Sequence, residues 1–263
     1  MADPLQRSLR SARRRLGTWL DHLAPRGCAL CARVLAPGAF PGFCTGCLLA
    51  LPGARRIRCP GCGLSNEATS PGSPAAGSSI DPPATAGRCR HCAGEATLDR
   101  TLAAADYAAP LDRAVTALKF GRQLGLARPL GELLAARWLG SADRIRLDCL
   151  VPVPLGEARL AQRGFNQSLE MARAMSAALA SPLPVHAWRL RRLRDTPAQA
   201  GLGLAARRVN LRGCFGARGS FAGLHVGLVD DVMTTGSTLT EAAGALKRAG
   251  AQRVVALVVA RTP

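Results

Sequence analysis

The sequence predicts an α/β fold: a mostly parallel sheet flanked by helices and preceded by a small cysteine-rich domain. Two observations carry this prediction. Four CxxC pairs all lie within the first 92 residues, whereas the second half alternates short apolar runs with helical patterns. With 263 residues and 48% hydrophobic composition, the chain can bury a sizeable core. We therefore expect two domains, at residues 1–98 and 99–263.

The N-terminal residues predict a basic amphipathic helix. Leucines recur at helical spacing, with arginines on the other faces, at Leu5, Leu9, Leu16, Leu20 and Leu23. Such a helix packs on the rest of the protein or lies on an anionic membrane or nucleic acid. The chain has no apolar run of transmembrane length and no secretory signal pattern, so we expect a cytoplasmic protein.

The cysteine spacing predicts two structural metal sites. A two-residue gap lets both thiolates of a tight turn face one ion, and two such turns complete a tetrahedral S4 shell. We expect zinc, with iron or a redox pair as alternatives. A sequential pairing is the simplest and a crossed one is the alternative. The sequential ligand sets are Cys28, Cys31, Cys44 and Cys47 for one site, and Cys59, Cys62, Cys89 and Cys92 for the other.

Composition adds an insertion and a strong positive charge. Residues 65–88 are rich in Ser, Pro, Gly and Ala, which predicts a flexible insertion in the second ribbon. The net charge is +18, and every basic residue except Lys119 and Lys247 is an arginine. This excess either attracts polyanions such as nucleic acid and phosphorylated ligands, or reflects a compositional bias towards arginine. The unpaired Cys149 and Cys214 are expected to act as small apolar residues.

The second half reads as alternating strands and helices, which indicates a parallel sheet covered on both faces. The expected strands are 147–155, 185–190, 224–232 and 253–261, and the expected helices are 166–179 and 238–250. In such sheets the ligand site lies beyond the carboxyl ends of the strands.

One strand end carries unusual chemistry, in VGLVDDVMTTGST. A buried strand is followed directly by Asp230 and Asp231, then by a loop of small hydroxylic residues at a helix start. Converging N–H groups, hydroxyls and the helix dipole suit a phosphate there. Two carboxylates beside a phosphate make sense if they bind sugar hydroxyls, help to hold a divalent cation or stabilise positive charge on the sugar.

This segment resembles the phosphoribosyl pyrophosphate (PRPP) motif of type I phosphoribosyltransferases. The resemblance implies that Asp230 and Asp231 contact the ribose hydroxyls and serve catalysis, and that the loop binds the 5-phosphate, with magnesium accompanying PRPP. The implied PRPP-binding residues are Asp230, Asp231, Val232, Met233, Thr234, Thr235, Gly236, Ser237 and Thr238.

A narrower resemblance, to the ComF/GntX family, covers nearly the whole chain. It is carried by TALKFGR, VPVPLGEARLAQRGFNQSLEMA and RDTPAQAGLGLAARRVNLRGCF together with the four CxxC pairs. It implies a double zinc ribbon before the phosphoribosyltransferase domain, and a mobile flap at residues 194–218. Candidate pyrophosphate or substrate contacts are Lys119, Arg122, Pro154, Arg159, Arg163, Asn166 and Gln167. For Asn166 a simple helix cap is the alternative.

The resemblance also implies a link to natural competence and to the processing of imported single-stranded DNA. Two functions follow. In one, the protein binds PRPP with magnesium, as a phosphoribosyltransferase or a fold derived from one. In the other, it is a non-catalytic protein that binds single-stranded DNA or assembles with DNA-uptake or recombination proteins. No histidine has an acid/base partner visible in the sequence, so no catalytic histidine is assigned.

Overall fold

The computed structural model describes residues 27–36, 39–65, 88–89, 92, 97–141, 146–194 and 213–262. The predicted N-terminal helix lies outside the described residues, as do nearly all of the predicted insertion and most of the predicted flap. None of the described helices is both long and apolar enough to cross a membrane.

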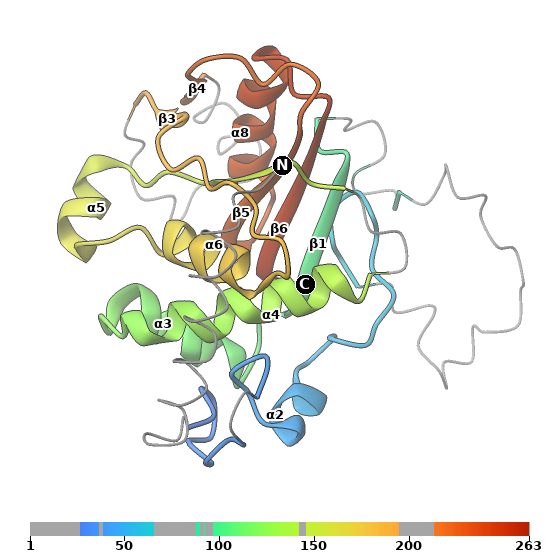
Figure 1. The fold of residues 1–263 in the computed structure, drawn as a ribbon, viewed down its shortest axis with the longest axis vertical. Coiled ribbons are helices and arrows are strands. Elements are labelled where there is room, and N and C mark those ends of the chain that lie inside the picture. The colour runs from blue at the N-terminus through green and yellow to red at the C-terminus, as the bar shows by residue number, and fades with distance from the viewer. Residues whose placement is uncertain are drawn as a thin grey trace, which may run out of the picture.

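A four-stranded parallel sheet forms the centre of the molecule (Figure 1), in the order β1-β6-β5-β2. Its strands are β1 (Arg100–Asp106), β6 (Arg253–Arg261), β5 (His225–Met233) and β2 (Cys149–Pro152). The two central strands, β5 and β6, are buried on both faces, which explains their nearly continuous apolar sequences. The parallel order brings the carboxyl ends of β1, β6, β5 and β2 to one edge of the sheet.

Helices cover both faces of this sheet, as predicted. Alternate residues of each strand point to opposite faces. One face packs on α4 and α6 together with α3, and the other packs on α8. The helices are α3 (Leu111–Phe120), α4 (Ala127–Leu139), α6 (Gln167–Ala178) and α8 (Ser237–Arg248), with the shorter α2 (Thr45–Ala50), η2 (Leu124–Leu126) and α5 (Glu157–Arg163) outside these layers.

The predicted strand at residues 185–190 is wrong as a strand of the main sheet. Only Val185 pairs with β2, through an isolated parallel bridge to Leu150. The chain then leaves the sheet and forms β3 (Leu190–Arg192), which pairs antiparallel with β4 (Phe215–Ala217). Leu190 and Phe215 are buried in the core on the α8 side, whereas Val185 and Ala187 are half-buried and Trp188 is exposed.

The cysteine-rich segments pack directly on the α/β part of the chain. The Gly42 N–H donates to Glu132 Oε2 on α4 (2.9 Å). The Thr101 N–H and hydroxyl on β1 donate to the carbonyls of Pro60 and Gly61, each at 2.7 Å. The buried side chains of the cysteine-rich segments belong to the same hydrophobic cores as those of the sheet and its helices. The division at residue 98 stays a prediction.

Gly131→Ala tests the close approach of α4 and α6. An added Cβ would lie 2.7 Å from Ala174 Cβ and 2.9 Å from the Met175 nitrogen, and the backbone of α6 cannot yield cheaply. We expect the free energy of unfolding to fall by about 1–2 kcal/mol, since overpacking outweighs the better helix propensity of alanine. Urea denaturation measures it. Gly125→Ala is the control, because no atom lies within 4 Å of its added Cβ; equal stability of the two variants would contradict the packing argument.

Candidate functional site

The acidic pair lies inside β5 rather than after it. The strand runs to Met233, so Asp230 and Asp231 lie near its carboxyl end, beside the carboxyl end of β6. Ladder pairing of Asp230 with Val258 and of Val232 with Ala260 carries the strand past the acids, in agreement with the predicted range 224–232. Asp230 is half-buried and Asp231 is buried.

A short hydroxylic loop, Thr234–Gly236, joins β5 to α8. Gly236 has φ of 81°, a left-handed conformation that glycine adopts without strain, and an added Cβ would lie 2.5 Å from Met233 Cε. The hydroxyls of Thr235 and Ser237 are 2.9 Å apart. The N–H groups of the first turn of α8 have no intrahelical acceptor, so the loop offers N–H and O–H donors at the positive end of a helix.

Side chains from α3 and α6 hold the two carboxylates. Lys119 Nζ, near the end of α3, lies 2.8 Å from Asp231 Oδ1. Gln167 Nε2, at the start of α6, donates to Asp231 Oδ2 at 2.8 Å. The Ser168 hydroxyl donates to Asp230 Oδ1 at 2.9 Å, and the Asp231 N–H donates to the same oxygen at 2.9 Å. Two segments far apart in the chain, the end of α3 and the start of α6, therefore converge on the pair in β5.

The pair is electrostatically unbalanced. Burial and the neighbouring charge of Asp231 raise the pKa of Asp230 to about 7, although Lys119 and hydrogen bonds from Asp231 and Ser168 oppose the rise. Among the described atoms, the buried Gln167 Oε1 also lacks a hydrogen-bond partner. A ligand that supplies hydrogen-bond donors or a divalent cation would relieve both conditions.

The remaining predicted substrate residues divide into two groups. Arg163 ends α5, and its guanidinium lies 5.1 Å from the centre of the Phe120 ring. Burial lowers the pKa of Arg163, and the charges of Asp231 and Asp230 oppose this, which places it in the field of the pair. Arg122 and Arg159 are exposed, and no contact between either of them and the pair is seen among the described residues. Pro154 is half-buried in the loop after β2.

Asn166 forms a helix cap. Its Oδ1 accepts from the N–H groups of Ser168 and Leu169, and its Nδ2 donates to the Val153 carbonyl at 3.0 Å. These contacts are those of a helix cap, which the sequence left open as the alternative to a substrate contact for Asn166. Ser168 is not among the residues predicted for the site, because a small hydroxyl at a helix start is as typical of a cap as of a binding site.

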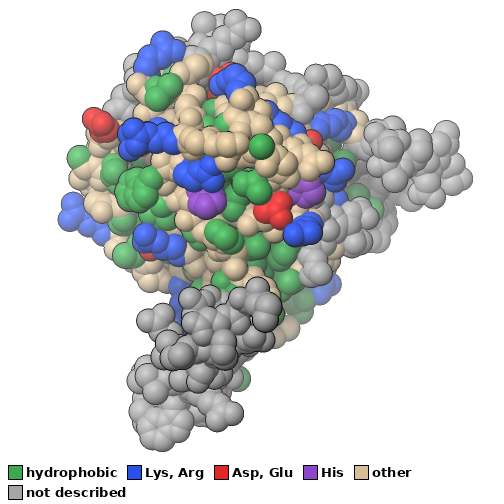
Figure 2. All heavy atoms as spheres, turned by 45° about the horizontal axis from the view of Figure 1, so that its top comes forward, with side chains coloured by type: hydrophobic (Ala, Val, Ile, Leu, Met, Phe, Trp, Pro, Cys, Tyr) green, Lys and Arg blue, Asp and Glu red, His purple; other side chains and the backbone are tan. Residues whose placement is uncertain are grey.

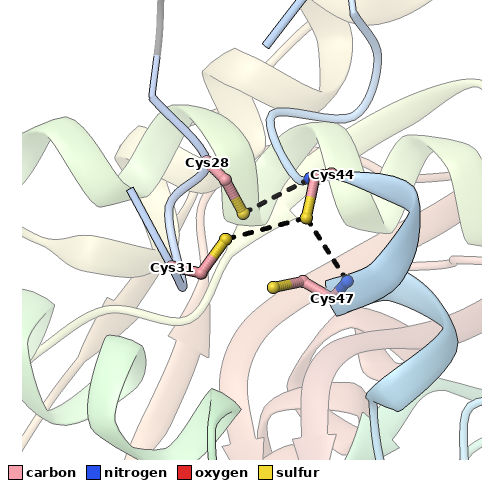
Figure 3. Close-up of side chains that lie close together, drawn as sticks. All are labelled: Cys28, Cys31, Cys44 and Cys47. Atoms are coloured by element: carbon pink, nitrogen blue, oxygen red, sulfur yellow. Dashed lines mark hydrogen bonds between the residues drawn. The ribbon is translucent and has the colours of Figure 1, made fainter. Parts of the chain in front are cut away.

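The eight paired cysteines form two separate clusters with the sequential pairing. In each cluster, sulfur atoms from four cysteines lie within 4.8 Å of one another. The first cluster is Cys28, Cys31, Cys44 and Cys47, whose side chains point towards one another (Figure 3). The second cluster is Cys59, Cys62, Cys89 and Cys92. Backbone N–H groups of Cys44 and Cys89 donate to the sulfurs of Cys28 and Cys59, at 3.3 and 3.2 Å.

The thiols of each cluster cannot all ionise without a cation. Burial raises the pKa of Cys28, but N–H donors from Cys44, Leu30 and Cys31 outweigh burial and bring it to about 6. Burial and the neighbouring Cys59 charge raise the pKa of Cys62 to about 11. A bound metal ion would offset the repulsion between the thiolates and lower their pKa values, because its positive charge stabilises all four together. Four sulfurs at this spacing fit a tetrahedral zinc ion.

Comparisons with known proteins agree with this architecture. The phosphoribosyl transferase domain model matches residues 143–263. DNA utilization protein YhgH of Escherichia coli strain K12 is 34% identical over 241 residues, covering 90% of this chain and 98% of the relative. The chain belongs to the ComF/GntX family. YhgH of Salmonella typhimurium is likewise 34% identical over 244 residues (90% and 98% of the two chains). Competence protein F of Haemophilus influenzae is 31% identical over 182 residues (65% and 79%). Within this family fold, the cysteine clusters and the acidic pair occupy the two parts of the chain that the sequence had singled out.

Metal content tests the two clusters. We expect two zinc ions per chain in protein purified without chelators, because each cluster offers a closed S4 shell. Cys31→Ser should lower the content to about one, by opening the first cluster only. Native mass spectrometry measures both values, and Cys214→Ser, outside both clusters, is the control. Fewer than one zinc in the unchanged protein would contradict the assignment.

Proposed function

We propose that this protein binds PRPP with magnesium at the carboxyl end of β5, as a phosphoribosyltransferase-like protein linked to natural competence and the use of imported DNA. The observation that carries the proposal is the acidic pair held by Lys119, Gln167 and Ser168 beside a hydroxylic helix-start loop. The printed names of the relatives, competence protein F and DNA utilization protein, support the biological setting.

Each element of the site has a defined task in this proposal. Asp230 and Asp231 accept hydrogen bonds from the ribose hydroxyls. The Thr234–Gly236 loop and the first turn of α8, including Ser237 and Thr238, bind the 5-phosphate through N–H and O–H donors. Lys119 and Arg163 contact the pyrophosphate, with Arg122, Pro154 and Arg159 further out. Magnesium, when bound with PRPP, neutralises pyrophosphate charge.

The carboxylates also suit transfer chemistry. Departure of pyrophosphate leaves positive charge on the ribose, and two fixed carboxylates stabilise that charge where it develops. The reaction is then transfer of the phosphoribosyl group to an acceptor. The double zinc ribbon of residues 1–98 is structural, since closed S4 shells offer no open position to a substrate. A reducing cytoplasm is the setting that keeps these thiols available for metal.

PRPP titration tests the site. Asp230→Asn combined with Asp231→Asn should abolish saturable heat in calorimetry with PRPP and magnesium, because both ribose-binding carboxylates are lost. Asp112→Asn on the first turn of α3 is the control and should bind as the unchanged protein does, since the hydrogen bond of the Asp112 carboxylate seen among the described residues is from the neighbouring Arg113 N–H. Equal binding by the double variant would place PRPP elsewhere.

The pH profile gives a second reading of Asp230. Because its pKa is raised to about 7, Asp230 is largely protonated at pH 6 and ionised at pH 8. Affinity for PRPP should therefore rise by about tenfold over this range from Asp230 alone. PRPP has its own ionisations, so the test compares profiles: Asp230→Asn should bind more weakly and lose this part of the slope. Parallel profiles would show that Asp230 does not titrate at the ligand.

Binding of single-stranded DNA is a second candidate function, favoured by one surface feature. The Phe120 ring is 67% exposed, follows Lys119 directly and lies under the Arg163 guanidinium. An exposed aromatic ring with an arginine beside it is suited to stacking a nucleobase. By contrast, the Lys and Arg side chains on the face drawn in Figure 2 are scattered rather than gathered in a stripe. Stacking of a nucleobase on Phe120, next to the acidic pair, is therefore better supported than binding of the DNA phosphates along a basic stripe.

Phe120→Ala tests this candidate. We expect affinity for a labelled oligothymidylate to fall roughly 5- to 100-fold, the range for loss of one stacked base. Fluorescence anisotropy at several salt concentrations measures it. Trp188→Ala removes another exposed aromatic ring and is the control. DNA binding that survives both Phe120→Ala and loss of the acidic pair would assign DNA to another surface.

A further inference from the structure

We propose that Arg261 is a positioning residue that couples metal binding in the second cysteine cluster to the shape of the Thr234–Gly236 loop. Arg261 is the last residue of β6, and its side chain bridges the two. Its Nε donates to the Cys62 carbonyl at 2.9 Å. Its Nη1 donates to the carbonyls of Met233 (3.2 Å) and Thr234, at the start of the loop.

The backbone arrangement makes this bridge possible. Met233 on β5 pairs with Arg261 on β6, so the two strands end side by side. The turn of the second cluster packs along β1, where Thr101 donates to the carbonyls of Pro60 and Gly61, and its Cys62 carbonyl comes within reach of the Arg261 side chain. Arg261 is therefore enclosed between the cluster and the loop, with 7% of its surface exposed.

The charge of Arg261 points to the cluster as its partner. A buried guanidinium requires a compensating negative charge. Among the described residues no carboxylate forms an ion pair with Arg261, and the charges that favour its cationic form are those of Cys62, Cys89 and Cys59. Four thiolates around one divalent cation carry a net charge of −2, so a metal-filled cluster provides that compensation and fixes the Cys62 turn.

The first cluster offers an internal comparison. Its contact with the α/β part runs through Gly42 and Glu132 on α4, which lies on the other face of the sheet from α8. None of its described hydrogen bonds reaches the Thr234–Gly236 loop. Metal loss from the second cluster should therefore loosen the loop, whereas metal loss from the first should leave it unchanged.

Hydrogen exchange of the loop amides tests the coupling without any ligand. In full-length, zinc-loaded protein, Cys89→Ser should speed exchange in peptides covering residues 234–239 by about tenfold, a typical coupling between two sites. Cys31→Ser should leave these peptides unchanged. Arg261→Met should produce the same acceleration while both metals are retained, and Arg253→Met, at the exposed start of the same strand, should not. If Arg261→Met fails to fold, Arg261→Lys serves, because one ammonium cannot span both sets of carbonyls.

Zinc release provides the reciprocal measurement, and this part rests on the proposed function. Coupling is mutual, so PRPP with magnesium should slow transfer of one of the two zinc ions to a chromogenic chelator by about tenfold and leave the other unchanged. Arg261→Met should lose this protection. Equal protection of both zinc ions by PRPP would overturn the proposal. Hydrogen exchange at residues 234–239 that is unchanged in Arg261→Met would also overturn it. Absence of PRPP binding would remove the proposed function alone, since the exchange experiment contains no PRPP.

Discussion

Two adjacent carboxylates at the end of a buried strand impose the constraint around which this fold is organised. Like charges this close repel, and burial adds to the cost of ionising them. Donors from distant segments offset this cost: Lys119 from α3, and Gln167 and Ser168 from the start of α6. These helices can reach β5 because the sheet order places it between β6 and β2, with the carboxyl ends of all four strands at one edge. The position of α6 in turn depends on the Asn166 cap.

The cysteine clusters supply order where side-chain packing is scarce. Only 4% of the residues are aromatic, and of the large apolar side chains described at residues 27–65 only Leu35, Phe43 and Leu51 are fully buried. A metal held by four sulfurs supplies folding free energy that such a small segment cannot obtain from a hydrophobic core. Each cluster packs on a different side of the α/β part, the first with the core of α4 and the second with the core of α8. The clusters thus act as two separate supports of one sheet.

Sequence reasoning succeeded where the chemistry is local. The CxxC spacing, the motif around Asp230 and the strands at 224–232 and 253–261 are each readable within a few residues. It failed where tertiary contacts decide. The sequence of β1, RTLAAAD, contains little of the β-branched character that marks a strand, yet pairing with β6 makes it one. The roles of Ser168 and Arg261 depend on partners 62 and 199 residues away, which no local pattern reveals.

The acidic pair also links stability to ligand binding. Because the pKa of Asp230 is raised in the folded protein, the folded state holds a proton that the unfolded chain releases near pH 4. Stability therefore falls as pH rises from about 4 to about 7, and above that range the full cost of keeping Asp230 ionised is present. A ligand that donates hydrogen bonds to this carboxylate removes part of the cost, so its binding is favoured by strain already present in the free protein. A neutral side chain at position 230 would give a more stable protein without that advantage, which is the compromise expected at a functional site.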